Sequence, residues 1–169
     1  MSSDQTAATS QPKRIILLRH AHAENDAPGG RDFDRALSSL GQEQCAQAAA
    51  WMQTQGLKPQ KVLCSPARRC EQTLTLVSAA MDGPVIQFEP RIYEATPGDL
   101  LPLFEPHLDA DCIMLVGHNP GLEGLAALLA SGRLGGHRGM PTASIACLSL
   151  PAGAALEPDA ASMEAFWWP

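Results

Sequence analysis

The stretch Ile15-Ile16-Leu17-Leu18-Arg19-His20-Ala21 is an apolar run that ends abruptly in arginine and histidine. A second apolar run, Ile113-Met114-Leu115-Val116-Gly117-His118, ends in glycine and histidine. Both runs have the length and the aliphatic content of buried strands. Ligands of open α/β sheets bind at the carboxyl ends of the strands, so the runs predict two histidines and an arginine at one edge. That set of side chains favours chemistry on an anion.

The alternation of strand and helix patterns predicts an α/β three-layer sandwich. We expect a mostly parallel central sheet of about five or six strands with helices on both faces. The predicted strands are residues 15–19, 62–64, 85–88, 112–116 and 143–150, the last of which is a candidate edge strand. The predicted helices are residues 38–55, 65–80, 96–105 and 119–131.

Length and charge narrow the class of protein. A chain of 169 residues favours one domain, which we place at 13–169, behind a polar leader, 1–12, that we expect to be disordered. The formal net charge of −6 argues against a nucleic-acid partner, because nucleic-acid affinity comes from a basic face. A few focused arginines can still make a local pocket attractive to an anionic substrate.

Cysteine usage and hydropathy indicate a cytoplasmic protein. The five cysteines are odd in number and include no Cys-x-x-Cys pair, which predicts reduced thiols and neither a disulfide framework nor a zinc site. No apolar stretch approaches the ~20 residues of a membrane span. The leader also lacks the charged start and apolar core of a signal peptide. Nothing in the sequence requires more than a monomer.

The segment Ser65-Pro66-Ala67-Arg68-Arg69 follows a predicted strand and has the cap-plus-proline pattern of a helix start. A helix N-terminus favours an anion through its free N–H groups and dipole. Arginine suits phosphate because its planar fork donates two parallel hydrogen bonds. Arg68 and Arg69 lie about 100° apart around a helix, so we expect only Arg69 to face the pocket.

With these segments the chain resembles the histidine phosphatase superfamily, and most closely its branch of short phosphohistidine phosphatases. The resemblance covers residues from about 14 to 150 and rests on motifs in the family's order. They are Leu18-Arg19-His20-Ala21, Ser65-Pro66-Ala67-Arg68-Arg69-Cys70-Glu71-Gln72-Thr73, Val116-Gly117-His118-Asn119-Pro120 and, more approximately, Asp32-Phe33-Asp34-Arg35-Ala36-Leu37-Ser38-Ser39-Leu40-Gly41.

The resemblance implies a metal-independent phosphatase that needs no cofactor. His20 would be the nucleophile, phosphorylated during turnover, while Arg19 and Arg69 would clamp the phosphoryl group. His118 would complete the pocket and stabilise charge in the transition state. The implied substrate is a phosphohistidine on a protein. A small phosphorylated metabolite is the alternative.

Two further residues are candidates with less support. Glu94 lies in Ile92-Tyr93-Glu94-Ala95, where the short branch often has Leu-Tyr-Glu-Ala. It is a candidate for the acid that protonates the leaving group, or else a solvated charge before a helix. Ser65, at the start of its motif, is a candidate substrate-binding hydroxyl.

Other readings of the same residues stay open. His20, His22, Glu24 and His118 have a spacing that a metallohydrolase permits, although that reading explains neither arginine. A phosphate-binding module without catalysis would need no nucleophile. Cys64 and Arg69 form Cys-x₄-Arg, whereas cysteine phosphatases need Cys-x₅-Arg, so Cys64 is interpreted as a buried core thiol.

Overall fold

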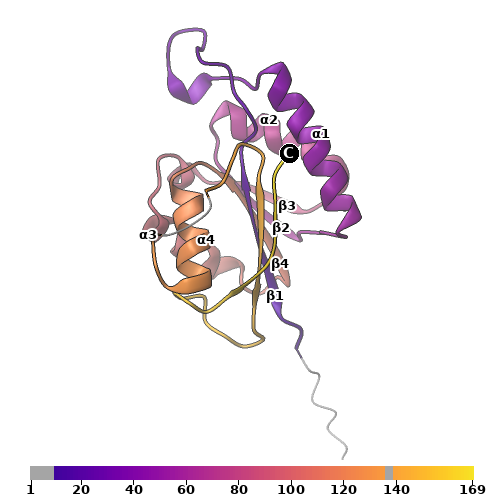
Figure 1. Cartoon of the computed structure of the whole chain (residues 1–169), viewed down its shortest axis with the longest axis vertical. Coiled ribbons are helices and arrows are strands. Elements are labelled where there is room, and N and C mark those ends of the chain that lie inside the picture. Colours follow the sequence, from indigo (N-terminus) through magenta and orange to yellow (C-terminus); the bar gives the residue numbers. More distant parts are fainter. Residues whose placement is uncertain (1–9, 136–138) are drawn as a thin grey trace, which may run out of the picture.

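The computed structural model describes residues 10–135 and 139–169, and it shows a six-stranded sheet in the order β3-β2-β4-β1-β5-β6 (Figure 1). The strands are β1 (Lys13–Arg19), β2 (Lys61–Cys64), β3 (Val85–Phe88), β4 (Cys112–Gly117), β5 (Ile145–Leu150) and β6 (Ser162–Trp167). Strands β1 to β4 are mutually parallel, while β5 runs antiparallel to both β1 and β6. The predicted mostly parallel sheet is confirmed. Residues 1–9 of the predicted leader lie outside the described residues.

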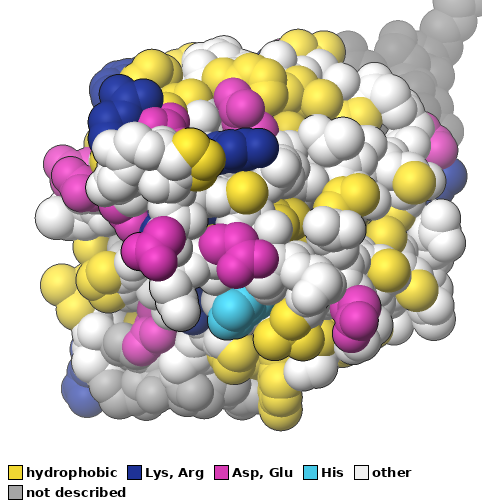
Figure 2. Space-filling model, turned by 90° about the horizontal axis from the view of Figure 1, so that it is seen from above, with side chains coloured by type: hydrophobic (Ala, Val, Ile, Leu, Met, Phe, Trp, Pro, Cys, Tyr) yellow, Lys and Arg dark blue, Asp and Glu magenta, His cyan; other side chains and the backbone are white. Residues whose placement is uncertain are grey.

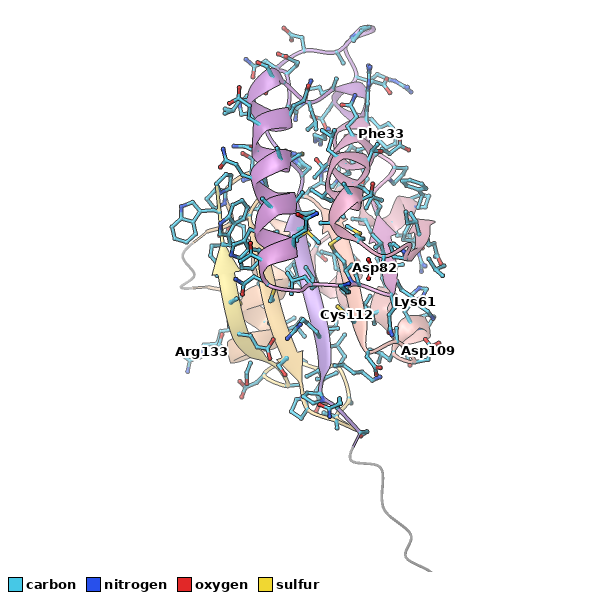
Figure 3. All side chains as sticks on the ribbon, turned by 90° about the vertical axis from the view of Figure 1, so that its right-hand side faces the viewer. Phe33, Lys61, Asp82, Asp109, Cys112 and Arg133 are labelled. Carbon is cyan, nitrogen blue, oxygen red and sulfur yellow. The ribbon has the colours of Figure 1, made fainter. Side chains whose placement is uncertain are left out.

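Helices cover both faces of this sheet. The α-helices are α1 (Ser39–Thr54), α2 (Arg68–Val77), α3 (Pro97–Leu100) and α4 (Gly121–Ser131). The 3₁₀ turns are η1 (Asp32–Asp34), η2 (Ser78–Ala80), η3 (Pro90–Ile92) and η4 (Leu101–His107). Helix α1 lies along one face, as Figure 3 shows, and α2 shares that face, while α3 and α4 cover the other.

Successive side chains of a β-strand point to opposite faces of the sheet, so one strand contributes to the core on both sides. In β1, Ile16 and Leu18 pack in the core beneath α1 and α2, whereas Ile15 and Leu17 pack in the core beneath α3 and α4. All four side chains are fully buried. A strand that is buried on both faces has an apolar residue at every position, and this continuous apolar run is why β1 could be predicted from the sequence.

Local signals place most helix ends where the sequence predicts them. Ser38 caps α1, with its side chain accepting a hydrogen bond from the Gly41 amide. Thr96 and Asp99 form a capping box at α3. The predicted helix to about residue 105 is wrong in its second half, because α3 ends at Leu100 and a 3₁₀ helix continues the chain. Pro102 and Pro106 lie in that segment and carry no N–H for an α-helical hydrogen bond.

Helix α2 does not begin at Ser65-Pro66 as predicted. It begins at Arg68, after Ala67 in an extended conformation. The Ser65 amide donates to Val116 O at 3.0 Å and so continues the hydrogen-bond ladder between β2 and β4 beyond Cys64. Ser65 therefore belongs to the sheet edge, and its hydroxyl does not cap the helix in the predicted way.

The carboxyl-terminal segment adds a strand that the sequence did not predict. Strand β6 pairs with β5, so β5 lies inside the sheet and the predicted candidate edge strand is wrong. Trp167 on β6 stacks on Trp51 of α1, with ring centroids 5.6 Å apart. This aromatic packing holds the carboxyl-terminal segment against α1. The residues just before β6 are rich in Ala, Gly and Pro and resemble a low-complexity segment.

The sheet order brings the predicted motifs together. Strand β1 pairs with β4 so that Arg19 lies opposite Gly117, and the His20 amide donates to Gly117 O at 3.0 Å. Strand β2 pairs with the other side of β4. The carboxyl ends of three neighbouring strands therefore present Arg19 and His20, then His118, then the turn to Arg69. Within the described residues, no helix has both the length and the apolar character of a membrane span.

Candidate active site

A cavity of about 420 Å³ lies at the carboxyl edge of the sheet. Seen from above, acidic and basic side chains lie close together around a histidine on this side of the molecule (Figure 2). The cavity brings together the four predicted residues His20, Arg19, Arg69 and His118. Its lining residues are Arg19, His20, His22, Ala23, Asn25, Asp32, Arg35, Arg69, Tyr93, Glu94, His118, Asn119 and Thr142.

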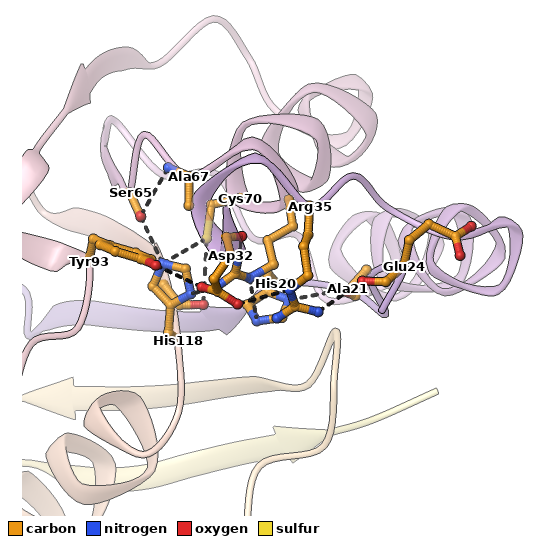
Figure 4. Close-up of polar contacts among 12 residues, drawn as sticks. His20, Ala21, Glu24, Asp32, Arg35, Ser65, Ala67, Cys70, Tyr93 and His118 are labelled. Atoms are coloured by element: carbon orange, nitrogen blue, oxygen red, sulfur yellow. Dashed lines mark hydrogen bonds and ion pairs between the residues drawn. The ribbon is translucent and has the colours of Figure 1, made fainter. Parts of the chain in front are cut away.

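The hydrogen bonds of His20 define its tautomer. Nδ1 lies 2.8 Å from Ala21 O, and a carbonyl oxygen only accepts, so Nδ1 carries the proton. Nε2 accepts a hydrogen bond from Arg69 Nε at 3.3 Å, which requires a lone pair on Nε2. His20 is therefore a neutral imidazole whose Nδ1–H is bound to Ala21 O (Figure 4), while its unprotonated Nε2 lies beside Arg69.

His118 is held in the opposite tautomer. Its Nδ1 lies 3.3 Å from Arg69 Nη2, which can only donate, so Nδ1 is the acceptor. Its Nε2 then donates to Ser65 Oγ at 2.8 Å. The ring centroids of His20 and His118 are 5.3 Å apart, so two neutral imidazoles flank one guanidinium.

Burial keeps both histidines neutral. It lowers the pKa of His20 to about 3 and the pKa of His118 to about 4, from the usual value near 6.5. The neighbouring arginine charges contribute to both shifts, because a positive charge disfavours a second one nearby. At neutral pH both histidine rings therefore have an unprotonated nitrogen close to the positive charges of Arg19 and Arg69.

Arg69 is the centre of the polar network. It is only 4% exposed, although it carries a full charge. Besides its contacts with the two histidines, its Nη1 donates to Asp32 O at 2.8 Å and its Nη2 to Asp32 Oδ2 at 3.0 Å. Arg68 is exposed, so the prediction that only one of the two arginines faces the pocket is confirmed.

Arg19 enters the cavity from the end of β1. Its Nη1 donates to Met140 O at 2.7 Å, while its Nε is a buried donor that has no hydrogen-bond partner among the described residues. Burial lowers the pKa of this guanidinium, and the nearby Glu123 carboxylate opposes that shift. Asn119 connects Glu123 with Met140, because its side-chain amide group donates to both Glu123 Oε2 and Met140 O at 3.0 Å.

Asp32 and Tyr93 are site residues to which the sequence assigned no role. The Asp32 carboxylate accepts from Tyr93 Oη at 2.7 Å and from Arg35 Nε at 2.9 Å, in addition to Arg69. These hydrogen bonds, that from Tyr93 foremost, hold the pKa of Asp32 well below its usual range. The sequence signal that could have identified Asp32 was the match of the segment from Asp32 to Gly41 to a family pattern.

The candidates with less support occupy different places. Glu94 is exposed at the cavity mouth, and no hydrogen bond of its carboxylate occurs within the described residues. Ser65 is fully buried beneath His118 and does not line the cavity. His22 lines the cavity with Nδ1 2.7 Å from Ser38 Oγ.

The other chemistries suggested by the sequence find no support in the geometry. Across residues 10–135 and 139–169, no group of three or more His, Cys, Asp and Glu side chains is arranged to hold a metal ion. Cys64 is fully buried in the core, as predicted, and burial raises the pKa of its thiol. A protonated, enclosed thiol is a poor nucleophile.

Comparison with known proteins agrees with this site. The family model of the histidine phosphatase superfamily (branch 1) matches residues 15–111. The chain belongs to the histidine phosphatase superfamily. The match includes the segments that carry Arg19, His20, Asp32 and Arg69, while His118 lies beyond its end.

Individual known proteins resemble the chain over most of its length. A crystal structure from Agrobacterium tumefaciens, assigned to the SixA phosphohistidine phosphatases, matches with a TM-score of 0.80 and 33% identity, covering 95% of this chain and all of that one. An uncharacterized protein of Picosynechococcus is 32% identical over 83% of this chain and 86% of its own length. An uncharacterized chloroplastic protein of Arabidopsis thaliana is 35% identical over 73% of this chain, a match spanning 62% of that relative.

The first prediction concerns the protonation of the two histidines. In NMR titrations of protein labelled on its imidazoles, His20 and His118 should remain neutral at pH 5, because burial opposes the charged form. His20→Gln and His118→Gln variants assign the signals. Inorganic phosphate should raise the pKa of His118, since a nearby anion favours its protonation. A midpoint near 6.5 for His20 in the empty site would contradict the burial argument.

The second prediction concerns Asp32 as a positioning residue for Arg69. Asp32→Asn should lower kcat/KM for p-nitrophenyl phosphate by roughly tenfold, the size of one lost charge-assisted hydrogen bond. Asp34→Asn is the matched control, because Asp34 lies on the same 3₁₀ turn and pairs with Arg31 outside the cavity. Equal activity of the two variants would show that Asp32 does not position the arginine.

Proposed function

We propose that this protein is a metal-independent phosphatase that works through a covalent phosphohistidine on His20 and acts on phosphohistidine in proteins. The main observation in support is that His20 is a neutral imidazole. Its Nε2 lone pair lies beside Arg69, and its Nδ1–H donates to Ala21 O. A neutral imidazole is a nucleophile, and the tautomer leaves Nε2 as the reacting atom.

Arg19 and Arg69 bind the phosphoryl oxygens in this proposal. Within residues 10–135 and 139–169, no acceptor pairs with the buried donor Arg19 Nε, which can therefore donate a hydrogen bond to an anion. The two guanidiniums would neutralise the charge spread over the equatorial oxygens during transfer. His118 gains a proton when the dianion enters, because the anion offsets the cost of a charged imidazole, and it then donates to a third oxygen.

The reaction proceeds in two displacements. His20 Nε2 attacks phosphorus, the Nε2–P bond forms, and the bond from phosphorus to the leaving nitrogen or oxygen breaks with its electron pair. Water then attacks phosphorus and gives up a proton to solvent. The Nε2–P bond breaks and returns its electron pair to Nε2, so that inorganic phosphate and neutral His20 are released. Low affinity of His20 for protons in the empty site keeps the nucleophile available over a wide pH range.

Three observations support phosphohistidine as the substrate. The similar structure from Agrobacterium tumefaciens is assigned to the phosphohistidine phosphatases. The segment between β3 and β4 is short and leaves little chain for a lid, which suits a phosphorylated side chain on another protein. An imidazole leaving group can depart already protonated, so it makes little demand on a general acid, a role for which the sequence offers Glu94 as a candidate.

The remaining attributes follow from the sequence expectations. We propose that residues 13–169 act as a single domain and that the protein works as a cytoplasmic monomer without a bound cofactor. Unpaired thiols support a reducing compartment, since Cys45, Cys64, Cys70, Cys112 and Cys147 are all free, and all but the half-buried Cys112 are buried.

The third prediction tests the nucleophile. His20→Ala should lower the hydrolysis of phosphoramidate and of phosphohistidine by roughly 10³-fold or more, as in other enzymes that lose a nucleophile. A reaction quenched in alkali should carry labelled phosphate on His20 of the wild type. EDTA should leave the rate unchanged.

The matched control is His107→Ala, which removes a histidine outside the cavity and should keep both activity and label. Turnover that survives in His20→Ala, or that disappears with EDTA, would refute the mechanism. Phosphate binding without any turnover would indicate a binding module instead.

The fourth prediction assigns Glu94. If Glu94 is the general acid, Glu94→Gln should slow the hydrolysis of alkyl phosphates by roughly 10²-fold or more while phosphohistidine is hydrolysed at nearly the wild-type rate. The difference arises because an alkoxide needs a proton to leave and a protonated imidazole does not. Unchanged rates on both substrates would make Glu94 a solvated charge. An equal loss on both would exclude it as the general acid and assign it to a step that the two substrates share.

A further inference from the structure

A second hollow of about 490 Å³ adjoins the catalytic cavity. The two share Glu94, His118 and Asn119, so they form one continuous surface. The second hollow is otherwise mainly apolar, and we call it the apolar trough. Its apolar lining comes from Ala95, Pro97, Pro120, Gly121, Gly124 and Leu134.

The floor of the trough is built by close packing of α4 against the segment that leads into α3. A Cβ on Gly121 would collide with Ala95 O, and a Cβ on Gly124 would collide with the ring of Pro97. The two glycines therefore allow this approach, and larger residues would prevent it. Because the capping box of Thr96 and Asp99 also fixes the start of α3, the trough is a preformed feature.

Glu94 forms the boundary between the cavity and the trough. Its φ of 58° is in the left-handed region that side chains other than glycine rarely adopt. Such strain is stored at functional sites when the surroundings impose it. The cavity on one side of this boundary is polar and binds phosphate in our proposal, whereas the trough on the other side offers apolar contacts. A ligand that spans both needs a phosphoryl group and an apolar group close together.

We propose that the apolar trough binds an apolar side chain of the substrate protein that lies next to its phosphohistidine. This inference rests on the proposed function and adds the sequence context that the enzyme selects. On a helix, residues three or four apart have Cβ atoms about 5–6 Å from one another, so a neighbour within one turn can reach the adjoining hollow. Leu134 at the rim is 59% exposed in the empty protein and would be covered.

A protein side chain fits the trough better than a polar metabolite does. Thr96 and Glu123 also line the trough, but most of its surface is apolar. The hydroxyl groups of a sugar phosphate would therefore lose water there and gain few hydrogen bonds in return, which costs free energy. An aliphatic side chain gains free energy by leaving water. The trough thus separates apolar protein substrates from small polar phosphate esters.

The test uses two short synthetic peptides with one phosphohistidine each, identical except for leucine or serine at the flanking positions. Wild-type kcat/KM should be about tenfold higher for the leucine peptide, the size expected from partial burial of a leucine side chain. Leu134→Asp should remove this preference. Phosphoramidate, which has no organic leaving group, should be hydrolysed equally by wild type and variant.

Val85→Asp is the matched control, because Val85 is a 68% exposed apolar residue on β3 away from the trough. It should keep the preference for the leucine peptide. Equal kcat/KM for the two peptides with wild-type enzyme would overturn the inference while leaving the proposed function intact. So would a preference that survives in Leu134→Asp, or one that Val85→Asp also removes. Failure of wild type to hydrolyse phosphoramidate and both peptides would overturn the proposed function as well.

Discussion

A buried guanidinium holds the candidate active site together. Arg69 is almost fully enclosed and donates to His20, to His118 and to both the carboxylate and the main-chain oxygen of Asp32. A buried charge is costly unless every donor is paired, so the chain must bring acceptors to it from several elements. The tautomers of the two histidines and the position of the loop that carries Asp32 are consequences of this requirement.

The same arrangement explains how the histidines can differ in role while both remain neutral. Arg69 donates to Nε2 of His20 but to Nδ1 of His118, and the remaining N–H of each ring is committed to Ala21 O and Ser65 Oγ respectively. One ring therefore presents the nitrogen that we propose as nucleophile. The other can accept a proton and then donate to the incoming anion. Electrostatic preorganisation of this kind acts before any substrate binds.

The part of the site predicted from sequence is the part placed by strands. Arg19, His20 and His118 directly follow long apolar runs, and a parallel sheet aligns the carboxyl ends of its strands wherever the strands pair. Arg69 was also predicted, although the helix that carries it begins at Arg68 rather than at Ser65-Pro66. The prediction tolerated that shift because Arg69 lies near the first turn of the helix with either starting residue, and the family pattern includes the same arginine.

The sequence by itself determined the buried strands, the alternation of strand and helix, and the residues that we propose bind a phosphoryl group. These depend on local composition and on motifs, which a linear chain displays directly. Only the tertiary structure decided that Asp32 and Tyr93 join Arg69, that Ser65 lies beneath His118, and that an apolar trough adjoins the cavity. Those contacts join residues far apart in the chain, and β6 likewise becomes a strand only by pairing with β5. A local sequence pattern does not indicate these distant partners, because the residues interact only after the strands and helices have packed together.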